Sequence, residues 1–596
     1  MADSPELHAH GVVRVSLFAE GTALPQSVAI ISVTVTRAIN QIPTARLVIA
    51  DGAMPSGQFP ISDSDSFKPG TAIKINAGYD DDEETLFEGI VIKLAVQITG
   101  QNCSRLVVEC LDKAVKMTVG RKNANFIDQL DSDVIGTLIE NAGLTADVET
   151  TTVRHTALVQ YCCSDWDFML ARADANGLLV IATHGRLAVK APATSASPVL
   201  EVTYGQDLRE FHAELDARTQ YASVKAVSWD MKTQAAAVGN DAGPAWLNAQ
   251  GDLDSATLAK VIGLASYRLQ TGAPAAKEAL TRWAQAHQLK SGLARISGRM
   301  SFQGHAKAVP GCIIELKGVG TRFSGKVFAS GVTHHIVDGV WVTEVQFGMS
   351  PPSSTEQANA TAASAAGLLP AVEGLQVGVV LRLDGDPEGE QRIQVEVPVM
   401  QAEAKGVWAR LLQFQGSNGF GAFFLPEVGD EVVLGYFNND PSHPVILGSL
   451  YSSKRVPPYA IAAENNTKAL VTRCKSKIEF DEDMKTITIT TPANNRVVIS
   501  DDGRSILLHD QNDNKVELNP SGITLDSPKD IKLNAKGGIT LDAVDTISIV
   551  SKADVKGAGL NVSCEAQVAF TAKGHARAEL SAAGQTVVKG AMVMIN

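Results

Sequence analysis

The chain has 596 residues, enough for three or four domains, and it is 45% hydrophobic and 5% aromatic with 50 glycines, which suits a β-rich globular protein. Its formal net charge of −13 argues against a nucleic-acid-binding surface, because such a surface needs a basic face. The seven cysteines follow no regular spacing, which argues against a disulfide framework or a Cys-x-x-Cys zinc pair and fits reduced thiols.

The N-terminal residues bear on targeting. Residues 1–6 are polar and acidic and lack the apolar core of a signal peptide, and no apolar run approaches the ~18 residues that a membrane helix needs. We therefore expect assembly in the cytoplasm and release by a route other than a cleaved signal.

The first part of the chain alternates between strand and helix patterns. Residues 11–110 alternate apolar and polar side chains with period two, which predicts an antiparallel sheet or barrel. Helices are predicted over 132–142 and 164–176, and Ser164 with Asp167 forms a capping box at the start of the second. The pattern then predicts a strand at 224–229, a loop at 231–254, helices at 256–269 and 275–289, and further strands within 293–347.

A linker and a small barrel follow. Residues 350–370 are rich in Ala, Ser, Thr and Pro with almost no charge, which marks the clearest domain boundary. Residues 372–451 contain several short strands and suit an OB-fold. Four aromatic residues of this part could form a stacking platform for oligonucleotides, but the barrel is not basic, so we assign them to its core. They are Phe414, Phe420, Phe423 and Phe424. The strands of this barrel are expected at 378–383, 391–397, 408–412, 423–424, 431–436 and 445–447.

An eight-residue repeat dominates the C-terminal part. Apolar pairs recur at about ten-residue steps over 476–520 and then every eight residues over 522–555, the octad segment. Each octad predicts a short strand and a polar turn, and such a period is typical of a stacked β-solenoid. The repeating apolar positions are Ile523, Ile531, Ile539, Ile547 and Val555, with Leu525, Leu533, Leu541 and Ile549 two residues after the first four.

One chain with one short strand per octad leaves its backbone ladder groups unpaired. Three chains wound about one axis would pair each strand with a neighbouring chain and bring the apolar rows together. We therefore infer an intertwined trimeric β-prism, with those nine residues as the core on the trimer axis. A single-chain β-helix is the alternative, although its rungs are usually longer.

The C-terminal residues suggest a binding site for another protein. After Val555 the apolar residues thin out, and the chain ends with Met592, Val593, Met594, Ile595 and Asn596. Three copies of this apolar end would form an exposed patch in water, which predicts a protein that caps the tip. The alternative, compatible with a cap, is that Val593 and Ile595 form the last axial rung.

Catalytic and metal-binding motifs are scarce. There is no Gly-x-Ser-x-Gly, His-Glu-x-x-His or P-loop sequence. His8 and His10 lie in a terminal segment, and His334 and His335 are neighbours on a strand, so they point to opposite faces and cannot share a metal. The acidic loop at 384–390 lacks EF-hand spacing and is interpreted as a solvent turn. We expect a non-enzymatic protein with no cofactor and no metal site.

The order of hub-like β domains, small barrel and terminal prism resembles the VgrG family, the spike proteins of type VI secretion and related contractile injection systems. The segments that carry the resemblance are Trp408-Ala409-Arg410, 424–433 and 440–451 in the barrel, and 164–178, which looks like a helix of phage hub proteins.

The resemblance implies a mainly β fold with a phage-hub-like (late control protein D-like) hub of β-barrel domains and a few helices (1–365), an OB-fold collar (366–455) and an intertwined trimeric β-helix spike (456–596). It also implies a homotrimer that contacts inner tube and baseplate proteins at the hub, a PAAR-type tip protein, possible effector cargo and the target membrane during puncture, but no nucleic acid.

Two other functions stay open at this point. One is a cell-wall-cleaving enzyme on a β-solenoid scaffold, which would need paired carboxylates about 5–9 Å apart. The other is a receptor-binding fibre of a phage tail. Among contractile systems, a cell-anchored secretion machine and a free phage-tail-like particle fit equally.

Overall fold

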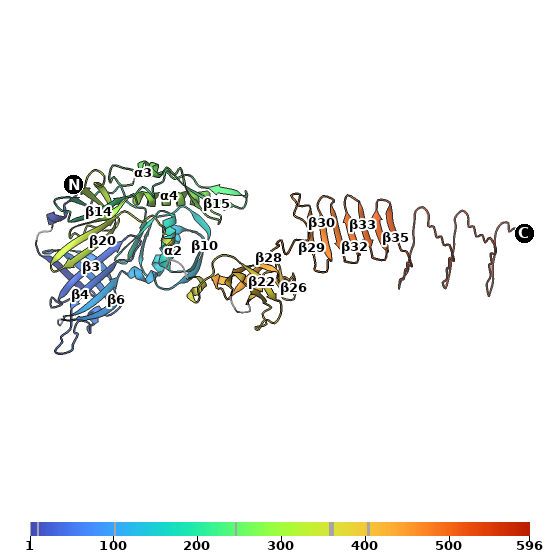
Figure 1. Ribbon diagram of the computed structural model, residues 1–596, viewed down its shortest axis with the longest axis horizontal. Coiled ribbons are helices and arrows are strands. Elements are labelled where there is room, and N and C mark those ends of the chain that lie inside the picture. Colours follow the sequence, from blue (N-terminus) through green and yellow to red (C-terminus); the bar gives the residue numbers. More distant parts are fainter. Residues whose placement is uncertain are drawn as a thin grey trace. The chain divides into compact units, whose positions relative to one another are not determined.

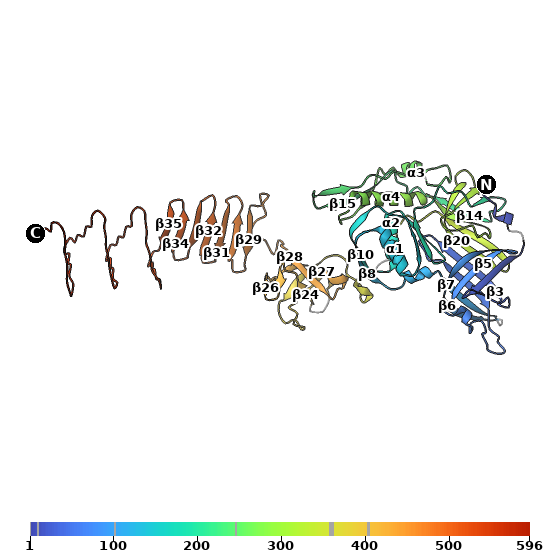
Figure 2. The same cartoon turned by 180° about the vertical axis from the view of Figure 1, so that it is seen from behind.

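The computed structural model describes residues 2–8, 11–100, 103–244, 247–356, 363–401 and 406–595. It divides into two compact units, Met1–Leu450 and Tyr451–Asn596, shown from opposite sides in Figures 1 and 2. The chain is mainly β with a few helices and one closed barrel, as the sequence predicts. None of the described helices is long and apolar enough to cross a membrane.

One large sheet forms much of the first unit. In the described residues its order is β14-β18-β21-β20-β3-β4-β7-β6-β5-β1-β2, with β13 and β19 attached beside β20. Because β20 pairs antiparallel with β3, the sheet predicted for residues 11–110 is only part of a larger one. The bounds are β1 Val13–Ala19, β2 Thr22–Ala23, β3 Ile30–Ala38, β4 Thr44–Ala50, β5 Ala72–Tyr79, β6 Asp82–Thr99, β7 Cys103–Leu111, β13 Leu200–Thr203, β14 Glu210–Leu215, β18 Ile296–Gln303, β19 Ile313–Lys317, β20 Gly325–Val337 and β21 Val340–Phe347.

Two helices pack with short strands in the middle of this unit. Helices α1 (Asp131–Asn141) and α2 (Asp165–Ala175) lie within one residue of their predicted bounds. Ser164 caps α2, because its Oγ accepts a hydrogen bond from the Asp167 backbone N–H at 3.1 Å. Gly177 follows the helix with a φ of +71°, a left-handed conformation that glycine adopts without steric cost. The strands here are β8 Lys122–Leu130, β9 Thr145–Val148, β10 Arg154–Cys163, β11 Leu179–Thr183 and β12 Arg186–Lys190.

Replacement of Ser164 with alanine is expected to lower the free energy of unfolding of this unit by about 1 kcal/mol, because the Asp167 backbone N–H loses its acceptor. Urea unfolding followed by tryptophan fluorescence measures this. Ser164→Thr retains the hydroxyl and is expected to keep most of the stability, so equal losses in the two variants would contradict a capping role.

Two further helices show where the sequence prediction was wrong. Helix α3 (Ser255–Ile262) ends at Gly263, which has a φ of +72°, and Tyr267–Gln270 is strand β17, so the helix predicted over 256–269 is too long. The predicted loop at 231–254 contains strand β16 (Ala235–Val238), which pairs with β15 (Val224–Asp230). Helix α4 spans Lys277–Leu293 and packs against β15.

The barrel that ends the first unit closes in the order β22-β23-β24-β28-β27. The core contains buried aliphatic residues from these five strands, such as Val395 and Leu434, and agrees with an OB-like barrel. Residues 423–424 are not a strand, contrary to the prediction. The bounds are β22 Gln376–Arg382, β23 Ile393–Glu396, β24 Val407–Leu411, β27 Glu431–Tyr436 and β28 Pro444–Ser449, with a small hairpin of β25 Gly416–Ser417 and β26 Phe420–Gly421.

The second unit begins with an antiparallel meander of seven described strands, each paired with the next in sequence. Five of its tight turns contain one non-glycine residue with positive φ, and Asp510 accepts hydrogen bonds from the backbone N–H groups of Asn512 and Asn514. We call this segment the meander; its strands are β29 Thr467–Val471, β30 Lys477–Asp481, β31 Thr486–Thr490, β32 Arg496–Ser500, β33 Ser505–His509, β34 Lys515–Asn519 and β35 Gly522–Asp526.

The octad segment differs from the prediction in the single chain. Residues 527–595 form neither helix nor strand, so the expected strand per octad is present only in the first octad, which is β35. The physical reason is the one that the repeat itself suggests, since one short strand per octad has no ladder partner within its own chain.

Candidate functional site

The meander has one apolar face made of two rows of side chains. Each strand from β30 to β35 contributes two residues two positions apart, which point to the same side of the sheet, and β29 contributes one. Cross-strand register aligns them, since Val497 lies opposite both Ile489 and Leu508. The first row is Leu470, Ile478, Ile489, Val497, Leu508, Val516 and Leu525, and the second is Phe480, Ile487, Ile499, Ile506, Leu518 and Ile523.

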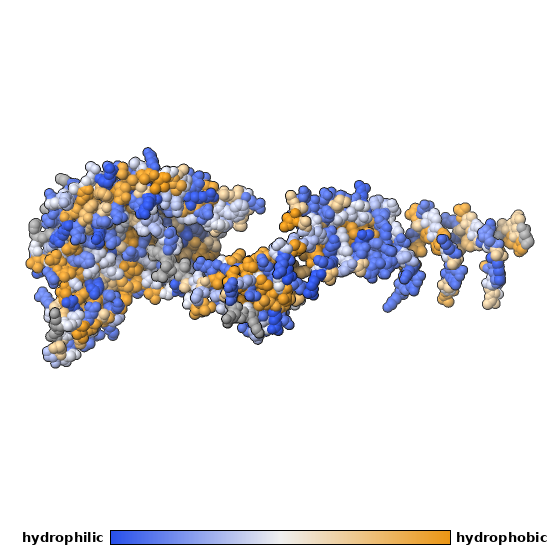
Figure 3. Space-filling view, viewed as in Figure 1, coloured by the Kyte–Doolittle hydropathy of each residue, from blue (hydrophilic) through white to orange (hydrophobic). Residues whose placement is uncertain are grey.

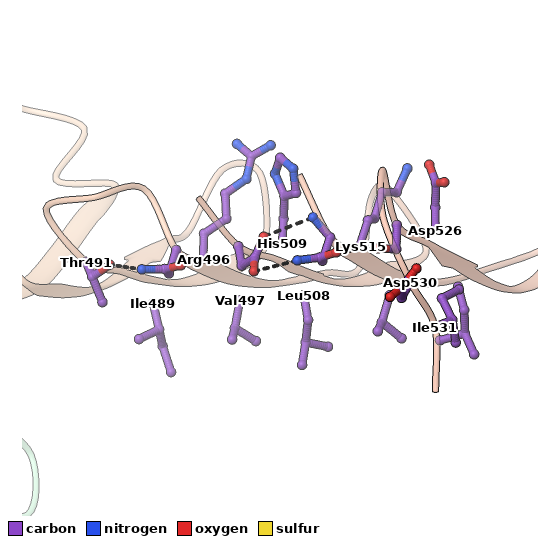
Figure 4. A pocket seen from close by; sticks show the side chains of 16 residues that line it. Ile489, Thr491, Arg496, Val497, Leu508, His509, Lys515, Asp526, Asp530 and Ile531 are labelled. Carbon is purple, nitrogen blue, oxygen red and sulfur yellow. Dashed lines mark hydrogen bonds between the residues drawn. The ribbon is translucent and has the colours of Figure 1, made fainter. Parts of the chain in front are cut away.

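This apolar face is uncovered in the single chain. The Leu508 side chain is 44% exposed, whereas Val35 in the first unit is 0% exposed. Figure 4 shows Ile489, Val497 and Leu508 on one side of the sheet and charged residues such as Arg496 on the other. A continuous open apolar face of this kind marks an interaction surface in a soluble protein.

A groove of about 490 Å³ joins the meander to the octads. The first-row residues Val516 and Leu525 line it. So does Ile531, the first repeating residue after β35, which is labelled in Figure 4. The apolar row therefore continues from the meander into the octad segment.

The predicted axis residues lie along the chain but are not brought together within it. Their exposure ranges from 52% for Ile547 to 73% for Ile523, so none is buried in a single chain. At the predicted tip, Met592, Val593, Met594 and Ile595 are also exposed, and Asn596 lies outside the described residues. The axial and tip roles of these residues stay predictions.

The residues predicted for the trimer axis did not include those of the meander before β35, although the apolar pattern of these strands is present in the sequence. From β30 to β34 the apolar pairs follow the same apolar-polar-apolar pattern as the octads, at steps of nine or ten residues instead of eight. The opposite face is polar: Lys477 Nζ donates to Glu479 Oε2 at 2.7 Å, and Tyr459 OH donates to the same carboxylate. Hydrogen bonds from Lys477 and then Tyr459 lower the pKa of Glu479 below its usual value.

His334 and His335 lie in different environments, as their neighbouring places on a strand predict, and the acidic loop takes part in an ion pair. His334 is buried and its Nδ1 lies 3.0 Å from Thr343 Oγ1, whereas His335 is exposed, so the two rings do not share a site. Asp386 accepts hydrogen bonds from the Arg392 guanidinium, the closest at 2.7 Å. Within the described part of the chain, no three His, Cys, Asp or Glu side chains form a group that could hold a metal ion. The side chain of His8 and all of His10 lie outside the described residues.

The assignment of four phenylalanines to the barrel core was wrong. Phe414, Phe420, Phe423 and Phe424 are all exposed, from 58% to 86%. They lie on and around the β25–β26 hairpin, outside the five barrel strands. Hydrophobic (orange) surface covers much of the barrel in Figure 3. An aromatic residue in a strand-rich segment is thus no guarantee of burial.

A buried ionic cluster in the first unit was also missed. Asp131 is 1% exposed and binds Arg172 through two hydrogen bonds of 2.6 and 3.0 Å, with Asn176 Nδ2 donating at 2.8 Å. Burial alone would raise the pKa of Asp131, but the hydrogen bonds and charge of Arg172, with bonds from His155 and Asn176, hold it below its usual value. The cluster joins α1, α2 and β10, and no short sequence motif marks it.

Two family matches cover most of the first unit. Residues 9–338, more than half of the chain, match the family described as the Alg8 N-terminal domain. Residues 376–451 match the type VI secretion system/phage-baseplate injector OB domain, which coincides with the closed barrel.

Individual relatives match over short stretches. The type VI secretion system spike protein VgrG3 of Vibrio cholerae is 28% identical over 113 residues, which is 17% of this chain and 11% of the relative. The spike protein VgrG1c of Pseudomonas aeruginosa is 26% identical over 128 residues, 19% of this chain and 17% of the relative. The chain thus matches these curated relatives over well under a fifth of their length.

Among solved structures, the 43 kDa tail protein of prophage MuSo2 from Shewanella oneidensis aligns with a TM-score of 0.44 and 11% identity, over 57% of this chain and 98% of that chain. Two of the curated relatives that this chain resembles are thus VgrG spike proteins, and its barrel matches an injector OB domain. Because the Alg8 N-terminal domain model matches more than half of the chain, the chain belongs to the Alg8 N-terminal domain family.

Proposed function

We propose that three copies of this chain form the structural spike of a contractile injection system, which joins the inner tube to the tip and is driven through a target membrane. The observation that carries the proposal is the open apolar face of the meander and its continuation into octads that have no strand partner in their own chain. The curated relatives are named as spike proteins, which favours a mechanical rather than a catalytic role.

Association of three meanders would bury the two apolar rows. Burial of apolar surface contributes about 25 cal/mol per Å², and the rows contain thirteen side chains in each copy. The polar face, with Lys477 and Glu479, would then face water. Along the octads, backbone groups that are unpaired in one chain would pair with neighbouring chains.

The remaining parts would connect the spike to its machine. In this proposal residues 1–365 form the hub on the inner tube and baseplate, 366–455 the collar and 456–596 the needle. A PAAR-type protein would cover the exposed residues 592–595 at the tip, and effector cargo would travel with the spike. The chain would be assembled in the cytoplasm and leave the cell as part of the particle.

Sedimentation equilibrium of the purified chain is expected to give the mass of three chains. A folded monomer or dimer at micromolar concentration would contradict the proposal. In the native system, a chain that ends at Asp526 is expected to allow particle assembly but to reduce delivery into target cells strongly, because the part of the needle after β35, with its tip, is missing. Unchanged delivery by that truncated chain would argue against a puncturing role, and the full-length chain expressed at the same level is the control.

A further inference from the structure

The chain changes its mode of strand pairing at β35. This strand pairs with β34 of its own chain, from Lys515 opposite Asp526 to Asn519 opposite Gly522. No other strand of the described residues pairs with it, so its second edge carries free backbone N–H and C=O groups. β35 is also the first octad, so the last strand of the meander is the first strand of the octad repeat.

We propose that the meander sets the register of the trimer: three copies associate first through its apolar face, and the free edge of β35 then starts the ladder between chains. The inference rests on the proposed trimeric spike and adds the order and the cause of its assembly. The partner surface is the same apolar face of the second and third copies.

The first support is that the meander can form before the chains meet. All its ladders lie within one chain and join strands that are consecutive in sequence, so each needs only a short loop to close. Hairpins of this kind form in about 1–10 μs, whereas the joining of subunits is slower and depends on concentration. The octads have no such local partner and stay unpaired until a second chain is present.

The second support is that the octads cannot select their own register. Residues 522–526 and 538–542 have the identical sequence Gly-Ile-Thr-Leu-Asp, so a slip of two octads places isoleucine on isoleucine and leucine on leucine. A slip of an even number of residues leaves every side chain on its original face, so burial of the apolar face does not oppose it. The meander shares the apolar-polar-apolar pattern but repeats less exactly. Phenylalanine occurs in only one of its strands, at Phe480, and the strands begin nine or ten residues apart until β35, which begins seven residues after β34.

The third support is that the two segments share one apolar row. Ile531 lines the same groove as Val516 and Leu525, so an association that covers the meander also positions the next octad. A partner that covered only the meander would leave the octad part of this row exposed. A second copy of the chain covers both, because it carries the same row with the same spacing.

Two matched substitutions in the full-length chain test the proposal. Leu508 lies in the middle of the meander and Ile539 in the middle of the octads, and both are about half exposed in a single chain. Leu508→Glu is expected to sediment as a monomer, whereas Ile539→Glu is expected to remain a trimer with a protease-sensitive site near residue 539. Thr490→Glu, on the polar face opposite Lys477 and Arg496, is the control and is expected to remain a trimer.

Hydrogen exchange during refolding of the wild-type chain gives a second, independent readout. Amides of β29–β35 are expected to gain protection first, in a phase that does not change with dilution, because these ladders lie within one chain. Octad amides are expected to gain protection later, in a phase that slows about tenfold or more when the chain is diluted tenfold, because their ladders need a second chain.

The proposal is overturned if the octads are protected first or together with the meander, or if Ile539→Glu yields monomers while Leu508→Glu yields trimers. If all three variants are trimers, the order in which meander and octad amides gain protection decides whether the proposal holds. A wild-type chain that is not a trimer contradicts the proposed function itself, which is a separate result.

Discussion

Replacement of Asp131 with alanine is expected to lower the free energy of unfolding of the first unit by about 3–5 kcal/mol. The carboxylate accepts two hydrogen bonds from Arg172 and one from Asn176 in a buried position. Its removal leaves the guanidinium largely buried and without this partner. All six tryptophans precede Tyr451, so tryptophan fluorescence during urea unfolding reports on this unit alone.

A neighbouring carboxylate provides the control for this variant. Asp133 lies in the same first turn of α1 but is exposed, so Asp133→Ala is expected to cost only about 0.3–1 kcal/mol through the helix dipole. Equal effects of the two variants would contradict the role of the cluster. Because the pKa of folded Asp131 lies below its unfolded value, its stabilisation is present above about pH 4 and is lost as the pH falls through the folded pKa.

Acidification from pH 7 to pH 5 is expected to remove about 2 kcal/mol of stability from the first unit through His334 alone. Burial, followed by the charge of Arg37, lowers the pKa of His334 to about 3. The unfolded chain takes up this proton near pH 6.5, whereas the folded chain does not. The stabilisation is therefore complete above pH 6.5 and declines as the pH falls toward 3.

Two variants isolate this effect. His334→Asn keeps a side chain that can hydrogen-bond Thr343 but does not titrate, so its stability is expected to fall less between pH 7 and pH 5 than that of the wild type. His335→Asn changes an exposed neighbour and is expected to keep the wild-type pH dependence. Urea midpoints at each pH, again by tryptophan fluorescence, measure the difference. Parallel pH profiles for wild type and His334→Asn would rule out the buried histidine as the cause.

Much of the fold follows from local patterns in the sequence. The period-two alternation predicted the strands, the Ser164–Asp167 pair predicted the start of α2, and the short strands of 372–451 predicted a small barrel. These features depend on residues close together in the chain, where backbone geometry and side-chain spacing act directly. The apolar rows of the second unit were visible for the same reason.

What the sequence did not reveal depends on contacts between distant residues. Asp131 and Arg172 are 41 residues apart, and nothing in either segment indicates that they meet in a buried site. The pairing of β20 with β3 joins segments far apart in the sequence, such as Gly331 opposite Ala38, which no local pattern encodes. The four exposed phenylalanines lie on and around a hairpin outside the barrel, and composition alone cannot tell on which side of a sheet a loop packs.

The direction of the hydrogen bonds in the meander has a mechanical consequence. In a sheet whose strands are stacked one after another, the backbone hydrogen bonds run along the stacking direction, with strands about 4.8 Å apart. Tension along that direction would open the hairpins one ladder at a time, whereas compression presses stacked backbones that are already in contact. The meander is therefore expected to resist a push along this direction far better than a pull.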